Sequence, residues 1–369
     1  PGLPACGSKL PLTGRLALVD SANQRLVVVD FKAGAAWQEP LPGTDVFLSF
    51  SPSGKLAAAI PATAAGIPSA LYDVGSGKQV GSVTLQGLIG WTPKDTLAAS
   101  TFRTAWSAAG DQAWIDYSTG LAHLRFAAQA DKDVTWPVTT APSDRIAQAV
   151  AWVPGTDLLL FEQHTAGNSM WITGGSLYTL NVKDGAVKDL KANMSLAFRF
   201  QWQPGVTGVM VYGDTSPNQG QVMGGQSLYV LDVVAGSRKA VALTSQVTVS
   251  SPAFTPDGQS ILFGAVLPAD QASANGPFTL PAIYLESPAK GEVHIVTQPP
   301  AGFSDTQPQL LPDGQSFLFY RIDDQQQTFS LRLGTLSGGV DQPVTGSLPL
   351  PLRTTPAEVD FGGVVVYQP

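Results

Sequence analysis

The stretch Phe254-Thr-Pro-Asp-Gly-Gln-Ser-Ile-Leu-Phe263 recurs almost unchanged as Leu310-Leu-Pro-Asp-Gly-Gln-Ser-Phe-Leu-Phe319. Pro-Asp-Gly is a tight-turn sequence, because proline sets φ for the first turn position and glycine tolerates a left-handed backbone. The apolar residues that follow each turn have the composition of a strand. Each copy therefore predicts a β-hairpin.

Weaker copies of the same pattern begin at Phe50, Trp91, Trp152 and Trp202, and each of them also precedes an apolar run. A second pattern follows these apolar runs. It is a strand with alternating apolar residues that is closed by a glycine-bearing turn, as in Leu177-Tyr-Thr-Leu-Asn-Val-Lys-Asp-Gly185. A short last strand completes four strands per repeat. Four antiparallel strands that recur in this way are typical of the blades of a β-propeller.

The repeats predict six blades, followed by a seventh that both chain ends would share. The six lie at 46–87, 88–145, 146–196, 197–248, 249–304 and 305–348. Five segments compete for the four places in the shared blade, namely 15–20, 25–31, 37–41, 357–361 and 363–367. We therefore expect an all-β fold: a seven-bladed propeller of four-stranded antiparallel blades, its ring closed by pairing of the N- and C-terminal segments. Six blades is the alternative. Residues 15–369 would form this single domain, with residues 1–14 as a tether.

The best repeats, at 254–263 and 311–319, resemble those of TolB-like β-propellers, and the resemblance covers residues 46 to about 345. The resemblance implies the propeller architecture. It implies no particular activity, because this repeat class occurs in binding proteins, in peptidase-associated propellers and in some lyases.

The composition agrees with many short strands. Of 369 residues, 21 are Lys or Arg and 28 are Asp or Glu, a charged fraction of 13% and a net charge of −7. A soluble domain usually has about 25% charged residues. The 38 glycines and 29 prolines favour tight turns, and together these features exclude a helical bundle and a disordered acidic tail. No basic stripe is present, so we expect no nucleic-acid partner.

The single cysteine lies in Leu3-Pro4-Ala5-Cys6-Gly7. This stretch resembles a bacterial lipoprotein cleavage site, although Pro4 departs from the usual pattern. We therefore hypothesise that the protein is extracytoplasmic, in the periplasm or at the cell surface. A lipid on Cys6 would be its only link to a membrane. The alternative is an unmodified, exposed thiol. A single cysteine allows no internal disulfide.

Long connections are predicted on one face of the blades, between second and third strands, at 61–69, 101–112, 163–175, 213–226 and 265–281. The turns on the other face are short. Insertions gathered on one face of a repeat protein commonly mark its binding face. The candidate binding residues in or beside these connections are Arg103, Trp106, His164, Met170, Trp171, Asp214, Met223, Arg321 and Asp323. For each of them the alternative is packing within its own loop.

Catalytic and metal-binding motifs are absent from the sequence. There is no Gly-x-Ser-x-Gly elbow, no Walker loop and no His-Glu-x-x-His. The three histidines, His123, His164 and His294, occupy non-equivalent repeat positions, so we expect no metal site and no cofactor. Glu162, Asp214, Asp323 and Asp324 are expected at roughly equivalent positions in three blades, where carboxylates could do acid–base work.

Two functions remain open at this point. The first is a non-enzymatic scaffold subunit that binds a protein partner, or joins a larger assembly, through the long-loop face. The alternative is a carbohydrate-binding or carbohydrate-cleaving propeller that uses Trp106, Trp171 and the loop carboxylates.

Overall fold

The computed structural model describes residues 12, 15–20, 25–31, 35–40, 46–51, 53, 55–61, 68–83, 88–92, 94–100, 104–129, 132–138, 145–165, 175–194, 200–214, 227–241, 248–266, 282–323, 325–326, 328–349 and 366–368. Within these residues the chain forms β-strands and one short 3-10 helix, η1 (Ala127–Gln129). The strands are β1 (Arg15–Asp20), β2 (Arg25–Asp30), β3 (Ala35–Pro40), β4 (Val46–Phe50), β5 (Leu56–Pro61), β6 (Ser69–Asp73), β7 (Gln79–Val83), β8 (Leu88–Trp91), β9 (Leu97–Ser100), β10 (Thr104–Trp106), β11 (Gln112–Asp116), β12 (Leu121–Arg125), β13 (Asp133–Pro137), β14 (Arg145–Trp152), β15 (Leu158–Thr165), β16 (Gly175–Asn181), β17 (Val187–Met194), β18 (Gln201–Trp202), β19 (Val209–Asp214), β20 (Ser227–Asp232), β21 (Ser237–Ala240), β22 (Thr248–Phe254), β23 (Ile261–Val266), β24 (Ala282–Ser287), β25 (Glu292–Ile295), β26 (Phe303–Leu310), β27 (Ser316–Asp323), β28 (Thr328–Thr335), β29 (Asp341–Pro343), β30 (Leu348–Pro349) and β31 (Val366–Gln368).

The strands form small antiparallel sheets. In the described part of the chain, six sheets have four strands each, one has five and one has two. The six follow the orders β3-β2-β1-β31, β4-β5-β6-β7, β10-β11-β12-β13, β14-β15-β16-β17, β18-β19-β20-β21 and β22-β23-β24-β25, and the five-stranded sheet contains β26-β27-β28-β29. In β14-β15-β16-β17 all three neighbouring pairs are antiparallel. These four-stranded meanders are the propeller blades that the repeats predict.

The chain divides into two compact units. The first comprises Pro1–Gln112, Phe126–Ala130 and Val344–Pro369, and the second comprises Ala113–Arg125 and Asp131–Pro343. In the first unit, β1 lies between β2 and β31, with Leu16 opposite Tyr367. One sheet is therefore built from both chain ends. Of the five candidate segments, the structure uses 15–20, 25–30 and 35–40, together with a strand at 366–368.

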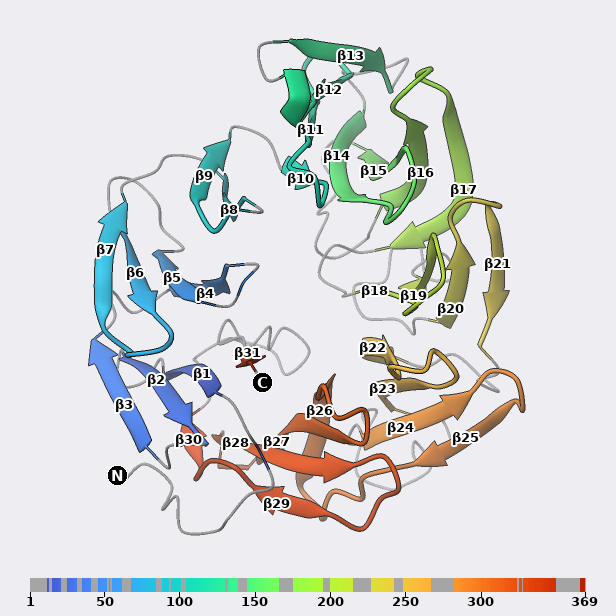
Figure 1. Ribbon diagram of the computed structural model, residues 1–369. Helices are drawn as coiled ribbons and strands as arrows, with labels where there is room; N and C mark the ends of the chain where they lie inside the picture. The colour runs from blue at the N-terminus through green and yellow to red at the C-terminus, as the bar shows by residue number, and fades with distance from the viewer. Residues whose placement is uncertain are drawn as a thin grey trace. The chain divides into compact units, whose positions relative to one another are not determined.

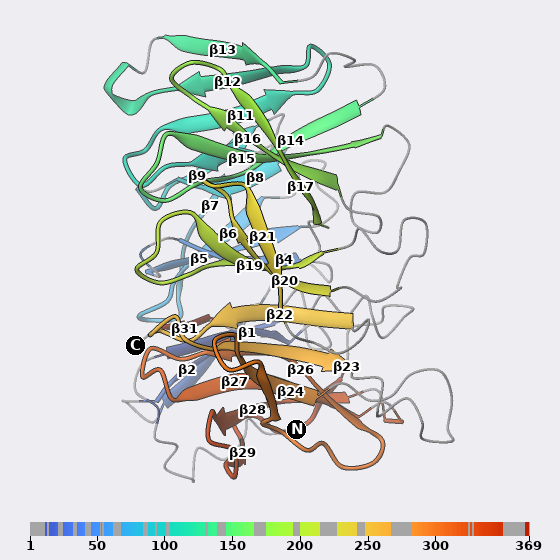
Figure 2. The ribbon, with the colours of Figure 1, turned by 90° about the vertical axis from the view of Figure 1, so that its right-hand side faces the viewer.

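Successive sheets of the second unit pack face to face (Figures 1 and 2). One buried cluster, which includes Leu160, Met210 and Leu231, lies between β14–β17 and β18–β21. A second, around Val211 and Phe263, lies between β18–β21 and β22–β25, and a third joins β22–β25 to β26–β29. Each inner sheet therefore buries both of its faces, which explains the nearly continuous apolar runs of its second strand.

The Pro-Asp-Gly repeats form the expected tight turns. The Asp313 carboxylate accepts hydrogen bonds from the backbone N–H groups of Gln315 (2.9 Å) and Ser316 (2.8 Å). Gly258 and Gly314 both adopt φ of +67°, a left-handed conformation in which glycine has no steric cost. Hydrogen bonding of the turn N–H groups by Asp and the freedom of Gly together explain why this sequence ends one strand and starts the next.

The segment 88–145, predicted as one blade, is divided differently in the structure. β8 and β9 form the two-stranded sheet, whereas β10 to β13 belong to a sheet of their own. The sequence placed residues 101–112 in a single connection, but Thr104–Trp106 is a strand. A hairpin turn follows it, in which the Gly110 N–H donates to the Ser107 carbonyl (3.0 Å). Three residues are too short a run for an alternating pattern to be recognised in sequence.

A pair of glycine substitutions will test the packing between blades. Gly185 and Gly205 have similar left-handed φ values of +75° and +71°, but a Cβ on Gly185 would lie 2.3 Å from Trp136 Cε3, whereas a Cβ on Gly205 would meet nothing within 4 Å. We expect Gly205→Ala to lower the free energy of unfolding by about 1 kcal/mol through backbone strain alone. Gly185→Ala should lower it by about 1–3 kcal/mol more, because its methyl group overlaps the indole of the preceding sheet. Equal losses in urea denaturation would show that the two sheets do not pack as described.

Candidate functional site

The long connections of the second unit leave its sheets at one end. Residues 166–174, 215–226 and 267–281 join β15 to β16, β19 to β20 and β23 to β24, and these three segments lie outside the described residues. We call this end of the sheets the long-loop end. At the opposite end the turns are short, for example 153–157, 182–186 and 233–236. The predicted asymmetry between the two ends is therefore present in these blades.

The described candidate residues lie on strands and not within loops. Trp106 is half-buried on β10, His164 is on β15, Asp214 is on β19, and Arg321 and Asp323 are on β27. The remaining candidates lie outside the described residues: Arg103, Met170, Trp171, Met223 and the lipidation candidate Cys6. The sequence interpretation ended the strands too early, because charged residues in a strand normally signal exposure, whereas these strands are covered on both faces.

The strand registers place Gln163, Asp214, Ala265 and Arg321 at one equivalent repeat position, two residues after the aromatic residue of the second strand. All four are buried. Glu162 is not equivalent to Asp214. It pairs with Leu177 and lies on the other face of β15 from Gln163, which is the residue equivalent to Asp214. The expected equivalence of Glu162, Asp214 and Asp323 is thus wrong. A correct alignment of the repeats would have had to recognise the insertion at 206–208.

Asp214 is the centre of a polar contact that crosses between two blades. The Tyr212 hydroxyl donates to Asp214 Oδ2 (2.7 Å), and the Arg238 guanidinium forms an ion pair with the same carboxylate. The Asn193 backbone N–H, from β17 of the preceding sheet, also donates to it (3.4 Å). Burial raises the pKa of Tyr212, and the neighbouring Asp214 carboxylate raises it further. The tyrosine is therefore held as a neutral donor.

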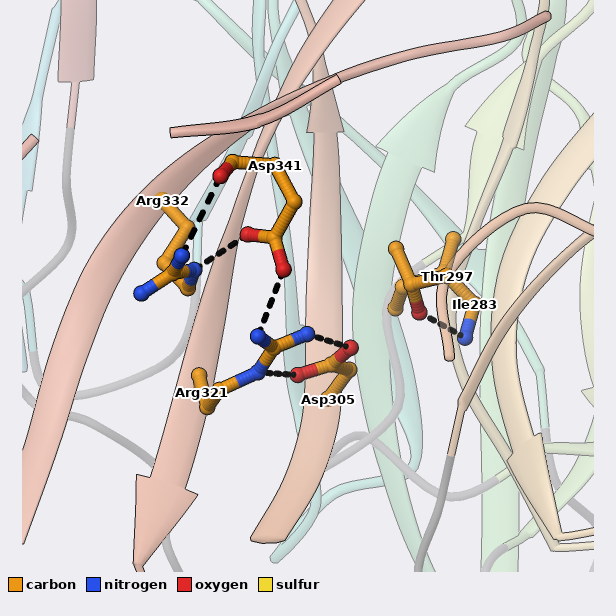
Figure 3. Close-up of polar contacts among 6 residues, drawn as sticks. All are labelled: Ile283, Thr297, Asp305, Arg321, Arg332 and Asp341. Atoms are coloured by element: carbon orange, nitrogen blue, oxygen red, sulfur yellow. Dashed lines mark hydrogen bonds and ion pairs between the residues drawn. The ribbon is translucent and has the colours of Figure 1, made fainter. Parts of the chain in front are cut away.

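Arg321 is the centre of an ionic network to which every strand of the blade β26–β29 contributes one residue (Figure 3). Its Nε and Nη2 donate to the two carboxylate oxygens of Asp305 on β26, at 2.7 and 2.6 Å. Its Nη1 donates to Asp341 on β29 (2.6 Å), whose carboxylate also binds Arg332 on β28. Burial raises the pKa of Asp305, an effect that the Arg321 hydrogen bonds oppose. Because the four residues come from four strands, the network fixes the register of the whole blade.

His164 and Glu162 are buried on β15, two residues apart on the same face of the strand. Gln163, on the other face, donates from Nε2 to the Val138 carbonyl at the end of the preceding sheet (2.6 Å). The sequence singled out His164 and Arg321 but missed Asp305, Asp341, Arg332 and Arg238. The residues next to Asp305 are Ser304 and Thr306, so the local sequence gave no signal that its carboxylate is buried.

The buried carboxylates Asp214 and Asp305 brace the blades through ion pairs. Asp214 and Asp305 are each held by an arginine, so neither is placed as a general acid or base. Among the residues that the structure describes, no group of three or more His, Cys, Asp or Glu side chains could hold a metal ion. The same residues contain no helix that is long and apolar enough to cross a membrane.

No protein-family model matches the chain, and no curated protein matches it significantly. Several solved structures do. A chain from a study of two prolyl endopeptidases has a TM-score of 0.54 at 12% identity, over 92% of this chain and 49% of that one. An acylaminoacyl peptidase of Pyrococcus horikoshii has a TM-score of 0.50 at 13% identity, over 90% and 51% of the two chains. TolB of Acinetobacter baumannii has a TM-score of 0.39 at 13% identity, over 89% and 78%.

This chain therefore spans about half the length of the two peptidase chains. At such identities the likeness is one of fold alone. The four-stranded antiparallel sheets confirm the β-propeller fold that the repeats predict, and TolB proteins are among the structures to which the chain is similar.

A double-mutant cycle will test the network around Arg321. We expect Arg321→Met to lower the free energy of unfolding by about 3–5 kcal/mol, because it leaves the Asp305 carboxylate buried without its cation. Adding Asp305→Asn should restore part of that loss, with a coupling free energy of about 0.5–3 kcal/mol. Urea denaturation of the two single variants and the double variant measures the coupling. Strictly additive losses would show that the two side chains do not act as a pair.

Proposed function

We propose that this protein is a non-enzymatic, extracytoplasmic scaffold subunit that binds a protein partner through its long-loop end. The observation that carries the proposal is the asymmetry of the connections: 166–174, 215–226 and 267–281 all leave the same end of successive blades. Loops of varied length and sequence on a rigid repeat framework are the usual way in which such folds make a recognition surface.

The braced strand ends support the same reading. β19 ends at Asp214, which is tied to Arg238, and the connection 215–226 begins at the next residue. Fixing the point at which a loop leaves the sheet reduces the conformational entropy that the loop loses on binding. The low charged fraction of 13% also suits a protein partner, because the centres of protein interfaces are depleted of charge.

A loop replacement will test this function. In one variant, residues 267–281 are replaced by the turn sequence Pro288-Ala-Lys-Gly291. In a matched control at the opposite end, Pro288-Ala-Lys-Gly291 is replaced by Val233-Val-Ala-Gly236. After cross-linking in the native host and affinity purification, we expect the loop variant to recover a stoichiometric partner about tenfold less well, or worse, a loss of about 1.4 kcal/mol in binding. The control should recover it normally.

Three outcomes would oppose the proposal. They are the absence of any stoichiometric protein in the unmodified preparation, retention of the partner by the loop variant, and loss of the partner only in the turn control. Binding of an oligosaccharide that the loop replacement abolishes would favour the carbohydrate alternative instead. Thermal unfolding of both variants shows whether they are folded.

We also infer a ring of seven blades closed by the sheet that β1 and β31 share. The six sheets of four strands and one of five that the described residues form support this inference, and β8–β9 would be an additional hairpin. Electron cryo-microscopy that counts six blades around the axis would contradict this inference.

The extracytoplasmic location rests on the resemblance of Leu3-Pro-Ala-Cys-Gly7 to a lipoprotein cleavage site. We expect the N-terminal peptide of protein extracted from native membranes to begin at Cys6, after cleavage of the Ala5–Cys6 bond, and to carry the additional mass of a lipid on that residue. An unmodified thiol in that fraction would exclude the anchor.

A further inference from the structure

His164 is a buried histidine for which the proposed function has no use. Its side chain lies on β15 near the long-loop end, and the residue is 6% exposed. Neither Nδ1 nor Nε2 has a hydrogen-bond partner among the described residues. Burying a polar ring without partners is unfavourable, and burying its protonated form is more so.

His164 lies in the junction between the sheets β14–β17 and β18–β21. Leu160 of β15 belongs to the cluster that joins these sheets, and side chains alternate along a strand, so Glu162 and His164 face β18–β21 as Leu160 does. Met210 and Tyr212 of β19 belong to the same cluster from the other side, so Asp214 faces back toward β15. We call this layer the His164 junction.

The ionisable groups that face the His164 junction come from five strands. They are Glu162 on β15, Lys188 on β17, Tyr212 and Asp214 on β19, Tyr229 on β20 and Arg238 on β21. Lys188 lies at the short-turn end, where its Nζ donates to the carbonyls of Val234 (3.2 Å) and Ala235 (2.7 Å). From β14 and β16 the described residues on this face are uncharged, among them Gln148 and Leu177. Asp214 is already held by Tyr212 and Arg238, and Glu162 is completely buried.

A proton on His164 would therefore add a charge to a ring whose two nitrogens are both buried. Burial lowers the pKa of the His164 imidazole from its ordinary value of 6.5. If the two sheets separated, water would hydrate the ring. The charged imidazolium gains more free energy from this hydration than the neutral imidazole does. Protonation consequently favours the separated arrangement over the packed one.

We propose that His164 is a proton-operated release for the junction between the sheets β14–β17 and β18–β21. Mild acid loosens these two blades from each other while the junctions of β22–β25 and β26–β29 stay closed. The connections 166–174 and 215–226 continue directly from the strands that carry His164 and Asp214, so the release acts at the long-loop end. This inference does not rest on the proposed function, because a loosened junction is measurable in the isolated protein.

The direction of the pH dependence follows from the lowered pKa. The unfolded chain takes up the proton near pH 6.5, and the folded chain takes it up only at a lower pH. The stabilisation due to neutral His164 is complete above pH 6.5 and is lost as the pH falls toward the folded pKa. In that window the unfolding equilibrium constant should rise about tenfold for each pH unit lost, on account of this one group.

His164→Gln removes the titration and keeps a polar side chain, and His294→Gln is the matched control because His294 is exposed on β25. Urea denaturation between pH 7.5 and 5 is measured for the unmodified protein and both variants. We expect His164→Gln to lose the proton-linked part of the pH dependence and His294→Gln to retain it. The same slope in all three proteins would overturn the proposal.

Two measurements place the effect at the junction. Hydrogen exchange at pH 5.5 should show lower protection factors for the amides of β15 and β19, relative to β23 and β27, in the unmodified protein but not in His164→Gln. The three histidines of the chain also give three imidazole titrations by NMR. If His164→Gln does not fold, single replacements of His123 and His294 assign the remaining signal to His164. A His164 pKa at or above 6.5, or uniform loss of protection, would refute the release.

Discussion

The structure depends on the burial of each blade between its two neighbours. In the four blades from β14 to β29, an aromatic residue of the second strand is completely buried: Phe161, Tyr212, Phe263 and Phe319. In three of the blades it also contacts an aromatic ring on the third strand, as Phe263 does with Tyr284. A fully buried large side chain contributes about 1.5–3 kcal/mol to stability, so a repeated set of such contacts outweighs any single polar interaction in the fold.

Burial on both faces dictates how this protein must treat polar residues in its strands. A charged group placed there loses its hydration and needs a fixed partner. Asp214 and Arg321 occupy the same repeat position and meet this requirement in different ways. Asp214 is bound by residues of its own sheet and by a backbone N–H of the preceding one, whereas Arg321 is bound within its own sheet by Asp305 and Asp341. Position 265, where the equivalent residue is alanine, avoids the requirement altogether.

The polar contacts and the turns differ in how much their sequences vary between repeats. The turns at 256–258 and 312–314 need proline, aspartate and glycine for local reasons, so they recur almost unchanged. The polar networks depend on residues far apart in sequence and appear in only some blades, which gives each junction its own strength. In the His164 junction, a ring with no hydrogen-bond partner among the described residues is buried in the same layer as the Asp214–Arg238 ion pair. A repeat fold can thus vary the stability of individual junctions while it retains the same strands.

The sequence by itself determined the repeat, its four strands and the turns that join them, because Pro-Asp-Gly chemistry and apolar runs act over a few neighbouring residues. It also identified the end of the blades that carries the long connections. Only the tertiary structure decided that His164, Asp214 and Arg321 are buried strand residues, that Asp305 and Asp341 clasp Arg321, and that 104–106 is a strand. Each of these outcomes depends on which face of a strand a neighbouring sheet covers, or on residues brought together across several strands. Local sequence contains neither kind of information.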